Sequence, residues 1–385
     1  MKPRMVTRLM RGFLCGRQPI NSRNFLNNMH ICHLSTVHRS DDVRIFQKQC
    51  RSLVLNDFRV SFVVPDDEDR EEDGVHIVVI ERNMSKFARL FVQPFKVLNK
   101  ALKIKADIYQ FHDYELWLVG FILKLLGKKV VADIHEDVPG QLLQRTWIPT
   151  ILRGFLSKVA LNLENTLARF MSGIITADEV LARRFSSLNG NVTAIENYPI
   201  LIEIPAENLH DNFVVKNFGG VFDERCAHTV IGASKIVSDT MFEIGGGIAS
   251  SYQDLAWQSD NCLYLGRVPS NDIYQHYVDA DVLVVMFSDA PNHQDIKSNR
   301  LFESMYAERP IVVSNLPKWK NFIDTHECGL VVDPDSPEQL AEAIEYLKQN
   351  PDLAVEMGRR GKQAVLKGYS WESQATKLTE FYRQI

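Results

Sequence analysis

The residues best suited to chemistry gather in one window, residues 294–315, which reads QDIKSNRLFESMYAERPIVVSN. A loop there enters a predicted helix, and the free amides of a helix start, together with Lys297 and Arg300, suit a diphosphate group. Asp295 and Glu303 stand eight residues apart, one in the loop and one on the helix. Each carboxylate can accept hydrogen bonds from two neighbouring hydroxyls, as on a ribose or another sugar. From these residues alone, a solvated charged helix end is an equal alternative.

A second candidate phosphate site follows another predicted strand, where Gly219 and Gly220 precede Arg225. Glycine lets the backbone approach a phosphate closely, and a guanidinium forms charge-assisted hydrogen bonds with it. The glycine run at 245–247 has the same position after a strand, but the geometry of a tight turn explains it equally well.

The first half of the chain also places polar residues after its predicted strands. His112 directly follows one strand, where an imidazole can donate to or accept from a sugar hydroxyl near neutral pH, although a lone histidine is more often structural. The next strand runs into DIHED at 133–137. This segment shapes an acceptor pocket through His135 and Glu136, or it forms a hydrogen-bonded turn in which Asp137 caps a helix. A metal ion could in principle bind the same segment.

Length and composition limit the class of protein that carries these groups. A chain of 385 residues is long enough for two domains, each with a buried core. A composition with 45% hydrophobic and 24% charged residues is that of a globular protein, and the net charge of −4 gives no overall attraction to nucleic acid. Six scattered cysteines without a CxxC pair argue against a disulfide framework or structural zinc and for a reducing cytoplasm. No apolar run of the sequence reaches the length of a membrane span.

Two successive blocks of alternating strands and helices must position the candidate residues. The alternation predicts, in each block, a doubly wound α/β domain with a parallel sheet, and an active site in the cleft between the domains, at the carboxyl ends of the strands. Predicted strands lie at 30–35, 59–64, 75–80, 107–111, 129–133, 173–176 and 192–195, then at 213–218, 241–244, 262–265, 281–287, 310–314 and 329–332. Predicted helices lie at 41–55, 86–102, 116–126 and 152–170, then at 271–278, 300–307, 337–349, 351–367 and 371–382.

The same pattern predicts the domain limits. The stretch 196–212 has few periodic features and contains two prolines, so we interpret it as the linker. We expect an N-terminal domain at 29–200, a C-terminal domain at 201–370 and a final helix at 371–385. Residues 1–28 carry six basic residues and no acid. They could be a transit peptide or a basic arm that touches a membrane, and we favour a disordered extension upstream of a start at Met29.

The window at 294–315 resembles the donor site of the retaining nucleotide-sugar glycosyltransferases of family 4, which have the GT-B fold. The motif LFESM and the strand entry RPIVVSN carry this resemblance. It extends over nearly everything from Met29 onward, since CHLSTVHRSDDVRIFQKQCRSL, YQFHDYEL and VVADIHEDVPGQLL are similar to landmarks of the first domain. CGLVVDPDSPEQLAEAIEYL and YSWESQATKLTEFY resemble the end of the second domain and a final helix that crosses back to the first.

The resemblance implies a role for each candidate residue. The expected catalytic residues are His112, which would contact the donor sugar near its anomeric carbon, and Asp295, which stands where the family has the first of two Glu residues. The expected donor-binding residues are Gly219, Gly220, Arg225, Lys297, Ser298, Asn299, Arg300 and Glu303. The expected acceptor-side residues are His38, His135 and Glu136.

The implied activity is transfer of a sugar from a nucleoside diphosphate to a hydroxyl of a saccharide or polyprenyl-linked acceptor, with retention at the anomeric carbon and without metal or another cofactor. The implied setting is the cytoplasm, in synthesis of a surface polysaccharide such as lipopolysaccharide or capsule. Alternating apolar and basic residues at 117–129 and 147–158 suit peripheral contact with the cytoplasmic face of the inner membrane, although core packing explains such a pattern too.

Two other functions remain open at this point. One is a nucleotide-sugar epimerase on the same fold. The other is a non-catalytic scaffold protein with a degenerate GT-B fold, which two departures from the family pattern motivate. Asp295 has a shorter reach than the usual Glu, and Gly220 occupies a position where the family has an Arg.

Overall fold

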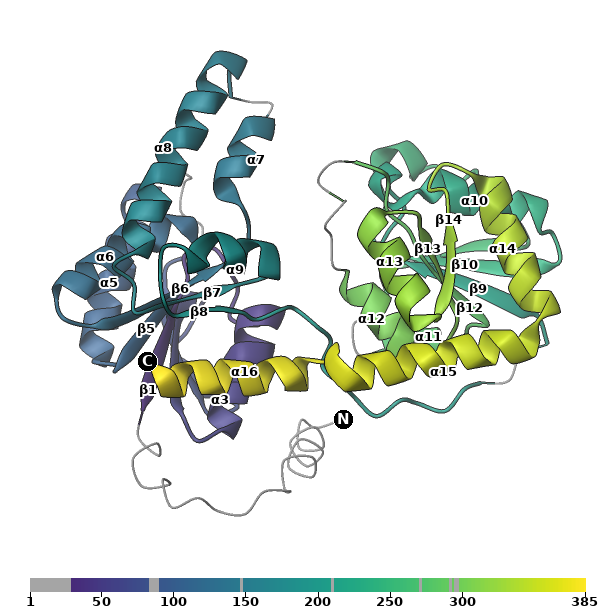
Figure 1. Cartoon of the computed structure of the whole chain (residues 1–385). Coiled ribbons are helices and arrows are strands. Elements are labelled where there is room, and N and C mark those ends of the chain that lie inside the picture. The colour runs from purple at the N-terminus through teal and green to yellow at the C-terminus, as the bar shows by residue number, and fades with distance from the viewer. Residues whose placement is uncertain are drawn as a thin grey trace. The chain divides into compact units, whose positions relative to one another are not determined.

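The computed structural model describes residues 29–82, 90–145, 148–208, 211–269, 272–290, 293 and 298–385. Contacts divide the chain into two compact units, Met1–Asn197 with Trp371–Ile385, and Tyr198–Ser370 (Figure 1). The predicted extension at 1–28 and the predicted site residues Asp295 and Lys297 lie outside the described residues.

The first unit is built on an eight-stranded sheet with the strand order β3-β4-β2-β1-β5-β6-β7-β8. All neighbouring strands pair in parallel except β3, which pairs antiparallel with β4 at the edge. Leu34 is in register with Phe111, and Phe111 with Ala132, so the residues at the carboxyl ends of three adjacent strands meet at one edge of the sheet. The strands are β1 (His30–Leu34), β2 (Arg59–Pro65), β3 (Arg70–Glu72), β4 (Val75–Ile80), β5 (Ile108–Phe111), β6 (Lys129–Ile134), β7 (Gly173–Thr176) and β8 (Val192–Ala194).

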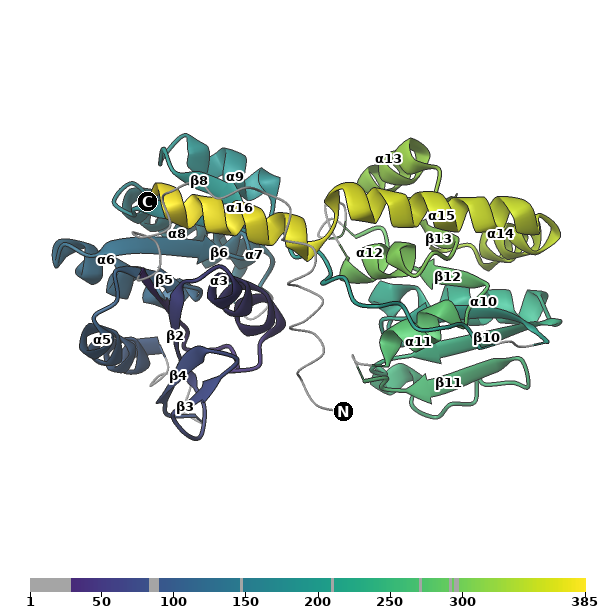
Figure 2. The same cartoon turned by 90° about the horizontal axis from the view of Figure 1, so that it is seen from below.

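Helices flank this sheet, as Figure 2 shows from below. Parallel neighbours require right-handed crossovers, which place helices on both faces and give the doubly wound arrangement predicted from the sequence. The helices of the first unit are η1 (Val43–Cys50), α3 (Arg51–Leu55), α5 (Gln93–Ile104), η2 (Tyr114–Leu116), α6 (Trp117–Leu125), α7 (Val138–Gln144), α8 (Thr150–Ala168), α9 (Glu179–Ser186) and α16 (Trp371–Gln384).

The predicted helix at 41–55 differs from expectation because most of it, η1, is a π-helix that continues into the short α3. Its start is fixed by Asp42, whose side chain accepts a hydrogen bond from the amide of Ile45. Among the buried residues of η1 are three long polar side chains, Arg44, Lys48 and Gln49. A buried polar face of this kind needs partners inside the unit.

The second unit has a six-stranded, fully parallel sheet with the order β11-β10-β9-β12-β13-β14. The two sheets together confirm the predicted α/β class. The strands of the second unit are β9 (Phe213–Phe218), β10 (Thr240–Gly245), β11 (Cys262–Gly266), β12 (Val282–Val285), β13 (Ile311–Ser314) and β14 (Gly329–Val332). Its helices are η3 (Asp223–Arg225), α10 (Ala227–Ile236), η4 (Ser250–Tyr252), α11 (Ile273–Val278), α12 (Asn299–Tyr306), α13 (Pro317–His326), α14 (Pro337–Gln349) and α15 (Pro351–Gly368).

The last helix, α16, belongs to the first unit although it follows the second along the chain. Trp371, which is 1% exposed, donates a hydrogen bond from its indole nitrogen to Oγ of Ser52 at 2.8 Å. Oε1 of Gln374 accepts from the amide of Glu196 at 3.0 Å. These buried contacts attach α16 to α3 and to the segment after β8.

Candidate functional site

A glycine turn at the carboxyl end of β9 forms the first part of the candidate site. Gly220 has a φ of +102°, and a Cβ there would lie 2.2 Å from a ring carbon of Phe222 and 2.7 Å from the carbonyl oxygen of Gly247. A side chain at this position would collide with both groups. The Arg that the family has at the position of Gly220 would therefore not fit in this chain.

Two guanidinium groups flank Gly219. A Cβ built on this glycine would lie 3.6 Å from Nη1 of Arg300 and 3.8 Å from Cδ of Arg225. Arg225 lies over the ring of Phe287, with its guanidinium carbon 3.7 Å from the ring centroid. Burial, and then the positive charge of Arg300, lower the pKa of Arg225 to about 10. Neither arginine forms an ion pair with a carboxylate of the described residues, although Glu224 acts on Arg225 from a distance and raises its pKa in part.

Glu303 lies on α12, one turn after Arg300. Its Oε2 accepts a hydrogen bond from the hydroxyl of Tyr277 at 3.2 Å. Tyr277 is 1% exposed, and burial followed by the charge of Glu303 raises the pKa of this phenol well above its usual value, so it remains a donor. The helix begins at Asn299 after the buried N-cap Ser298, whose side chain makes no capping hydrogen bond. The structure therefore brings four predicted donor-binding residues, from Ser298 to Glu303, onto one short helix and its cap.

The polar edge of the first unit, where β1, β5 and β6 end, is centred on Asp133. Its Oδ1 accepts from Nη2 of Arg44 at 3.0 Å, and its Oδ2 accepts from Nε2 of Gln49 at 2.7 Å. The same Oδ2 lies 3.1 Å from Nδ1 of His112 and 3.2 Å from Nε2 of His135. Burial alone would raise the pKa of Asp133, but the charge of Arg44 and the two imidazoles lower it well below its usual value. Asp133 is therefore a buried carboxylate that organises this edge.

His112, the predicted catalytic histidine, is enclosed by protein. Its side chain is 0% exposed, and its Nε2 lies 3.0 Å from Nδ1 of His33, whose ring stacks on it with a centroid distance of 5.2 Å. Burial lowers the pKa of His112, and the hydrogen bond to Asp133 offsets this only in part. The ring is therefore neutral near neutral pH, with both nitrogens beside protein groups.

His38, on the loop after β1, lies between two carboxylates. Its Nδ1 is 3.0 Å from Oδ2 of Asp42, and its Nε2 is 3.4 Å from Oδ1 of Asp113. Burial lowers the pKa of His38, but the two carboxylates outweigh it and raise the pKa above the usual value. The side chains of His38 and His135 are 27% and 19% exposed, and their ring centroids are 5.5 Å apart. The structure thus brings two of the three predicted acceptor-side residues together.

The third of these residues, Glu136, accepts a hydrogen bond from Nε2 of Gln141 at 2.5 Å. The alternative prediction, that Asp137 caps a helix, is correct for the position, since Asp137 is the N-cap residue of α7, and wrong for the hydrogen bond that a capping side chain would accept. Asp137 makes no capping hydrogen bond at α7 and pairs with Arg184 at 3.3 Å. Pro139 occupies the first turn of α7 and has no N–H to donate, which removes one of the groups that a cap would satisfy.

His112, Asp133 and His135 also offer one ligand atom each within 4.8 Å of one another, a spacing that a metal ion could use. However, Oδ1 of Asp133 already bonds the guanidinium of Arg44, and its Oδ2 accepts from Gln49. A cation bound here would contact the carboxylate of Asp133, whose negative charge the guanidinium of Arg44 already balances.

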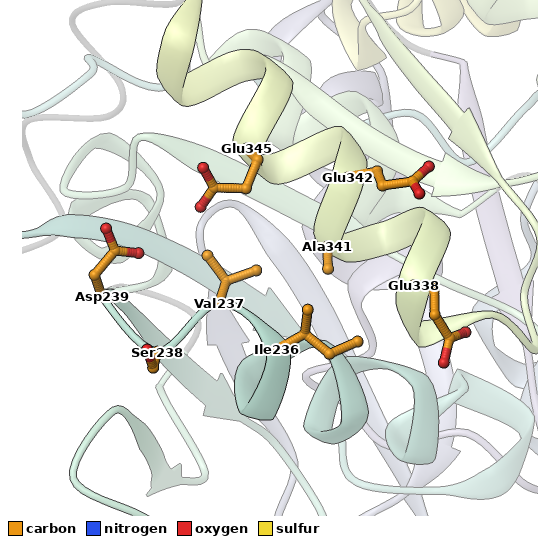
Figure 3. Close-up of a pocket in the computed structure, with 8 residues that line it drawn as sticks. All are labelled: Ile236, Val237, Ser238, Asp239, Glu338, Ala341, Glu342 and Glu345. Carbon is orange, nitrogen blue, oxygen red and sulfur yellow. The ribbon is translucent and has the colours of Figure 1, made fainter.

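A surface pocket of about 410 Å³ lies between the end of α10 and α14, as Figure 3 shows. Its lining combines three apolar side chains with four carboxylates, of which Asp239 pairs with Lys348 at 2.7 Å. The pocket residues after α10 lead into the start of β10, so they lie at the amino ends of the strands. Gly219 and the arginines lie at the carboxyl ends, and this pocket is therefore separate from the candidate site. The lining residues are Ile236, Val237, Ser238, Asp239, Glu338, Ala341, Glu342 and Glu345.

Two doubly wound parallel-sheet units, one of which ends its first strand in a glycine turn flanked by two arginines, are the architecture of the GT-B glycosyltransferases. Comparison with protein families agrees with this class. The model described as "Glycosyltransferase Family 4" matches residues 43–197, and the model described as "Glycosyl transferase-like" matches residues 229–380. The chain is therefore a glycosyltransferase, and its residues 43–197 match family 4.

Individual relatives are distant. The chain is 27% identical to the GDP-mannose-dependent alpha-(1-6)-phosphatidylinositol monomannoside mannosyltransferase of Mycobacterium tuberculosis over 127 residues, which are 32% of this chain and 33% of that protein. The match thus spans about a third of the length of that relative. The chain is 20% identical over 384 residues to the capsular polysaccharide biosynthesis glycosyltransferase CapM of Staphylococcus aureus, covering 93% of this chain and 99% of CapM.

Among solved structures, the fold is similar to that of HepE of Anabaena in complex with UDP-glucose. The two structures have a TM-score of 0.67 at 14% identity, covering 93% of this chain and 100% of HepE. In the ranges that the structure describes, no helix combines the length and apolar character that crossing a bilayer requires.

The sequence alone did not point to several residues of these sites. Gln49 and Arg44 lie on a helix whose polar face could be taken for a solvated one, and His33 lies inside a strand, where a histidine has no motif around it. Tyr277 and Phe287 lie within a predicted helix and a predicted strand, and no motif around them indicates a role in the site. One signal in the sequence could have indicated Arg44 and Gln49: the helical period places these long polar residues on the face of η1 that packs against the sheet.

Proposed function

We propose that this protein transfers a sugar from a nucleoside-diphosphate donor to a hydroxyl of a saccharide or lipid-linked saccharide during synthesis of a surface polysaccharide, in the cytoplasm. The observation that carries the proposal is the pair of arginines, Arg225 and Arg300, that flank Gly219 and form no ion pair with a carboxylate in the part of the chain that the structure describes. Such a pair is well suited to a diphosphate. The complex of HepE with UDP-glucose and the role of CapM in capsular polysaccharide biosynthesis support the donor and the setting.

The proposed mechanism depends mainly on stabilising the leaving group. As the bond to the anomeric carbon breaks, negative charge develops on the diphosphate, and Arg225 and Arg300 would stabilise it together with the amides at the start of α12. Glu303, held by the hydroxyl of Tyr277, would accept hydrogen bonds from two neighbouring hydroxyls of the donor. The two guanidinium groups supply the positive charge that a metal ion would otherwise supply, so the proposal includes no cofactor. Retention at the anomeric carbon is part of the proposal by analogy with the family.

Binding of the donor tests the arginine pair directly. We expect a nucleoside diphosphate to bind more tightly than the corresponding monophosphate in isothermal titration calorimetry. Arg225→Ala and Arg300→Ala should each weaken diphosphate binding about 10-fold or more, because each removes a charge-assisted hydrogen bond. Arg359→Ala is the matched control, since this arginine pairs with Glu356 on α15. Equal affinity for the diphosphate in all four proteins would contradict the proposal.

Product analysis separates transfer from the two alternatives. With donor and acceptor, we expect a glycosylated acceptor and a nucleoside diphosphate. An epimerised nucleotide sugar formed without acceptor would indicate the epimerase instead. If the wild-type protein transfers sugar and Glu303→Ala does so at the same rate, the assignment of Glu303 to the donor site is wrong.

We also propose that the first unit makes peripheral contact with the membrane that carries the acceptor. Figure 1 shows α7 and α8 extending from the sheet of this unit. The side chains of Ile151 and Phe155 on α8 are 88% and 65% exposed, and Leu152 and Val159 are exposed beside them. Lys158 is exposed on the same helix. Exposed apolar side chains together with a basic one are typical of a surface that enters the interface of an anionic bilayer.

Vesicle flotation tests this contact. We expect the protein to float with vesicles that contain anionic phosphatidylglycerol and to float less with purely zwitterionic vesicles. The double variant Ile151→Ser with Phe155→Ser should lose most of this binding, whereas Val355→Ser, which changes a 68% exposed residue on α15, should not. Flotation of the double variant at the wild-type level would contradict the proposed surface.

A further inference from the structure

The guanidinium of Arg225 lies against an aromatic ring and not against a carboxylate. Its central carbon is 3.7 Å from the ring centroid of Phe287, which follows β12 and is 3% exposed. Within the described ranges, no group accepts a hydrogen bond from this guanidinium or forms an ion pair with it, and the charge of Glu224 acts on it only from a distance. The N–H donors of Arg225 are therefore available to a ligand.

A ring and a carboxylate support an arginine in different ways. A carboxylate neutralises the guanidinium and occupies its fork of donors, so an anionic ligand must displace it. The face of an aromatic ring also attracts a cation, but the ring has no net charge, and the guanidinium keeps its own. The positive charge of Arg300 repels Arg225, and the attraction of the ring opposes this repulsion. Phe287 can thus hold Arg225 in place without competing with an anion.

Two backbone hydrogen bonds fix Phe287 relative to Arg225. The amide of Phe287 donates to Oγ of Ser314 at 2.9 Å, which ties it to the end of the neighbouring strand β13. The amide of Ser288 donates to the carbonyl oxygen of Glu224 at 3.1 Å. The residue after the ring is thus bonded to the residue before the arginine, so the two segments that carry this pair keep their register.

Two further rings fix the orientation of the Phe287 side chain. The centroid of the His293 ring lies 5.2 Å from that of Phe287, with 68° between the planes, and the centroid of Trp319 lies 5.4 Å away, with 86° between the planes. Such edge-to-face contacts are favourable and set the direction of the ring plane. Because Phe287 and Trp319 are both buried, a change of rotamer at Phe287 would displace closely packed neighbours.

We propose that Phe287 is a positioning residue that holds the guanidinium of Arg225 beside Gly219, ready to bind the diphosphate of the donor. The inference rests on the proposed function for the identity of the ligand. Phe287 acts through Arg225 and makes no contact with the ligand itself. By ordering the guanidinium before the donor arrives, the ring reduces the conformational entropy that binding would otherwise cost.

NMR of the full chain with labelled arginine tests the pair without any ligand. Protons above the face of an aromatic ring are shielded, so we expect the side-chain N–H signal of Arg225 to lie upfield of those of exposed arginines such as Arg39. Arg225→Lys assigns the signal by its loss. In Phe287→Leu the upfield displacement should disappear. A wild-type signal of Arg225 at the position of the exposed arginines would overturn the inference.

A double-mutant cycle tests whether Phe287 acts through Arg225. We expect Phe287→Leu to weaken binding of UDP or GDP about 3- to 10-fold in isothermal titration calorimetry. In the Arg225→Ala background the same change should have no effect, because the guanidinium that the ring holds is absent. Equal losses in the two backgrounds would mean that the ring supports only the general fold of the site, and the inference would be wrong.

A fluorinated ring separates the charge distribution of Phe287 from its packing. Replacing Phe287 by 3,4,5-trifluorophenylalanine nearly keeps the shape of the ring but removes most of the negative potential of its face. We expect this protein to bind the nucleoside diphosphate as weakly as Phe287→Leu. The same analogue at Phe242, a fully buried ring of β10, is the matched control and should leave the affinity unchanged. Wild-type affinity with the analogue at position 287 would contradict the inference.

These outcomes distinguish the inference from the proposed function. If the wild-type protein binds the diphosphate and the analogue at position 287 binds it equally well, the role of Phe287 fails and the proposed function stands. If neither nucleotide binds and no donor supports transfer, the proposed function fails, whereas the NMR signal of Arg225 still decides whether Phe287 holds this side chain.

Discussion

The hydroxyl of Tyr277 is a single-atom test of the donor site. Because it donates to Oε2 of Glu303 at 3.2 Å, Tyr277→Phe removes one hydrogen bond and leaves the ring in place. We expect the KM for the donor to rise about 3- to 10-fold, the equivalent of roughly 1 kcal/mol, with kcat little changed if Glu303 binds the donor before the reaction. Steady-state kinetics with varied donor measures this effect.

Tyr346→Phe is the control for this substitution, since Tyr346 lies on α14 and is 48% exposed. A donor KM that rises equally in both variants, or in neither, would argue against a role of Glu303 in donor binding.

Individual residues show how far sequence reasoning reached and where it stopped. The LFESM motif predicted the helix that carries Glu303, because its apolar residues repeat at helical spacing and face the core. The enclosure of His112 was not predictable, since it depends on His33, which is 79 residues away in the sequence. The side-chain cap expected from Asp137 was wrong because local propensity did not include the partner Arg184.

At the scale of elements, η1 carries the arginine that joins the polar edge of the first unit to the segment after β8. Nη1 of Arg44 donates to the carbonyl oxygen of Ile195 at 2.8 Å, while its Nη2 pairs with Asp133. Arg44→Ala would leave the charge of Asp133 buried without its main partner. We expect a loss of about 3–5 kcal/mol in the free energy of unfolding, measured with urea.

Arg51→Ala is the comparison on the adjacent α3, because Arg51 pairs with Asp73 near the surface and its side chain is 24% exposed. This change should cost less than about 1 kcal/mol. Equal losses in the two variants would mean that Asp133 does not depend on Arg44.

The sequence predicted mainly those elements in which apolar residues recur at regular helical or strand spacing. The buried strands and the long helices α8, α14 and α15 were expected near their observed positions, because they carry sustained apolar repeats. β3, α9 and α13 were not among the predicted elements, since segments of 3 to 10 residues contain too few repeats. The spacing of apolar residues does not distinguish a π-helix from an α-helix, so the π-helical geometry of η1 could not be predicted.

At the scale of the whole molecule, buried histidines predict a dependence of stability on pH. Burial, and then the charge of Arg59, lower the pKa of His30 from 6.5 to about 4, and burial also lowers the pKa of His33 and His112. Below pH 6.5 the unfolded chain therefore binds more protons than the folded one at these sites, so the free energy of unfolding falls as the pH decreases.

Urea unfolding of the full chain between pH 7.5 and 5 measures this dependence. Each of the three histidines can contribute a slope of up to about 1.4 kcal/mol per pH unit. His38 acts in the opposite direction, because its raised pKa stabilises the fold at low pH and that contribution is lost as the pH rises. His30→Asn should reduce the net slope. Stability that is constant or rises toward pH 5 would contradict the prediction.

The placement of α16 has a consequence for the order in which the protein is made. The first unit consists of a piece that ends at Asn197 and a second piece that starts at Trp371, and the whole of Tyr198–Ser370 lies between them in the chain. At ribosomal speeds of about 5–20 residues per second, the surface that receives Trp371 and Tyr382 waits uncovered for roughly 10 to 35 s after its own residues have emerged. The unit that begins translation first is thus completed last, and a chaperone that shields an unfinished sheet would have its opportunity in that interval.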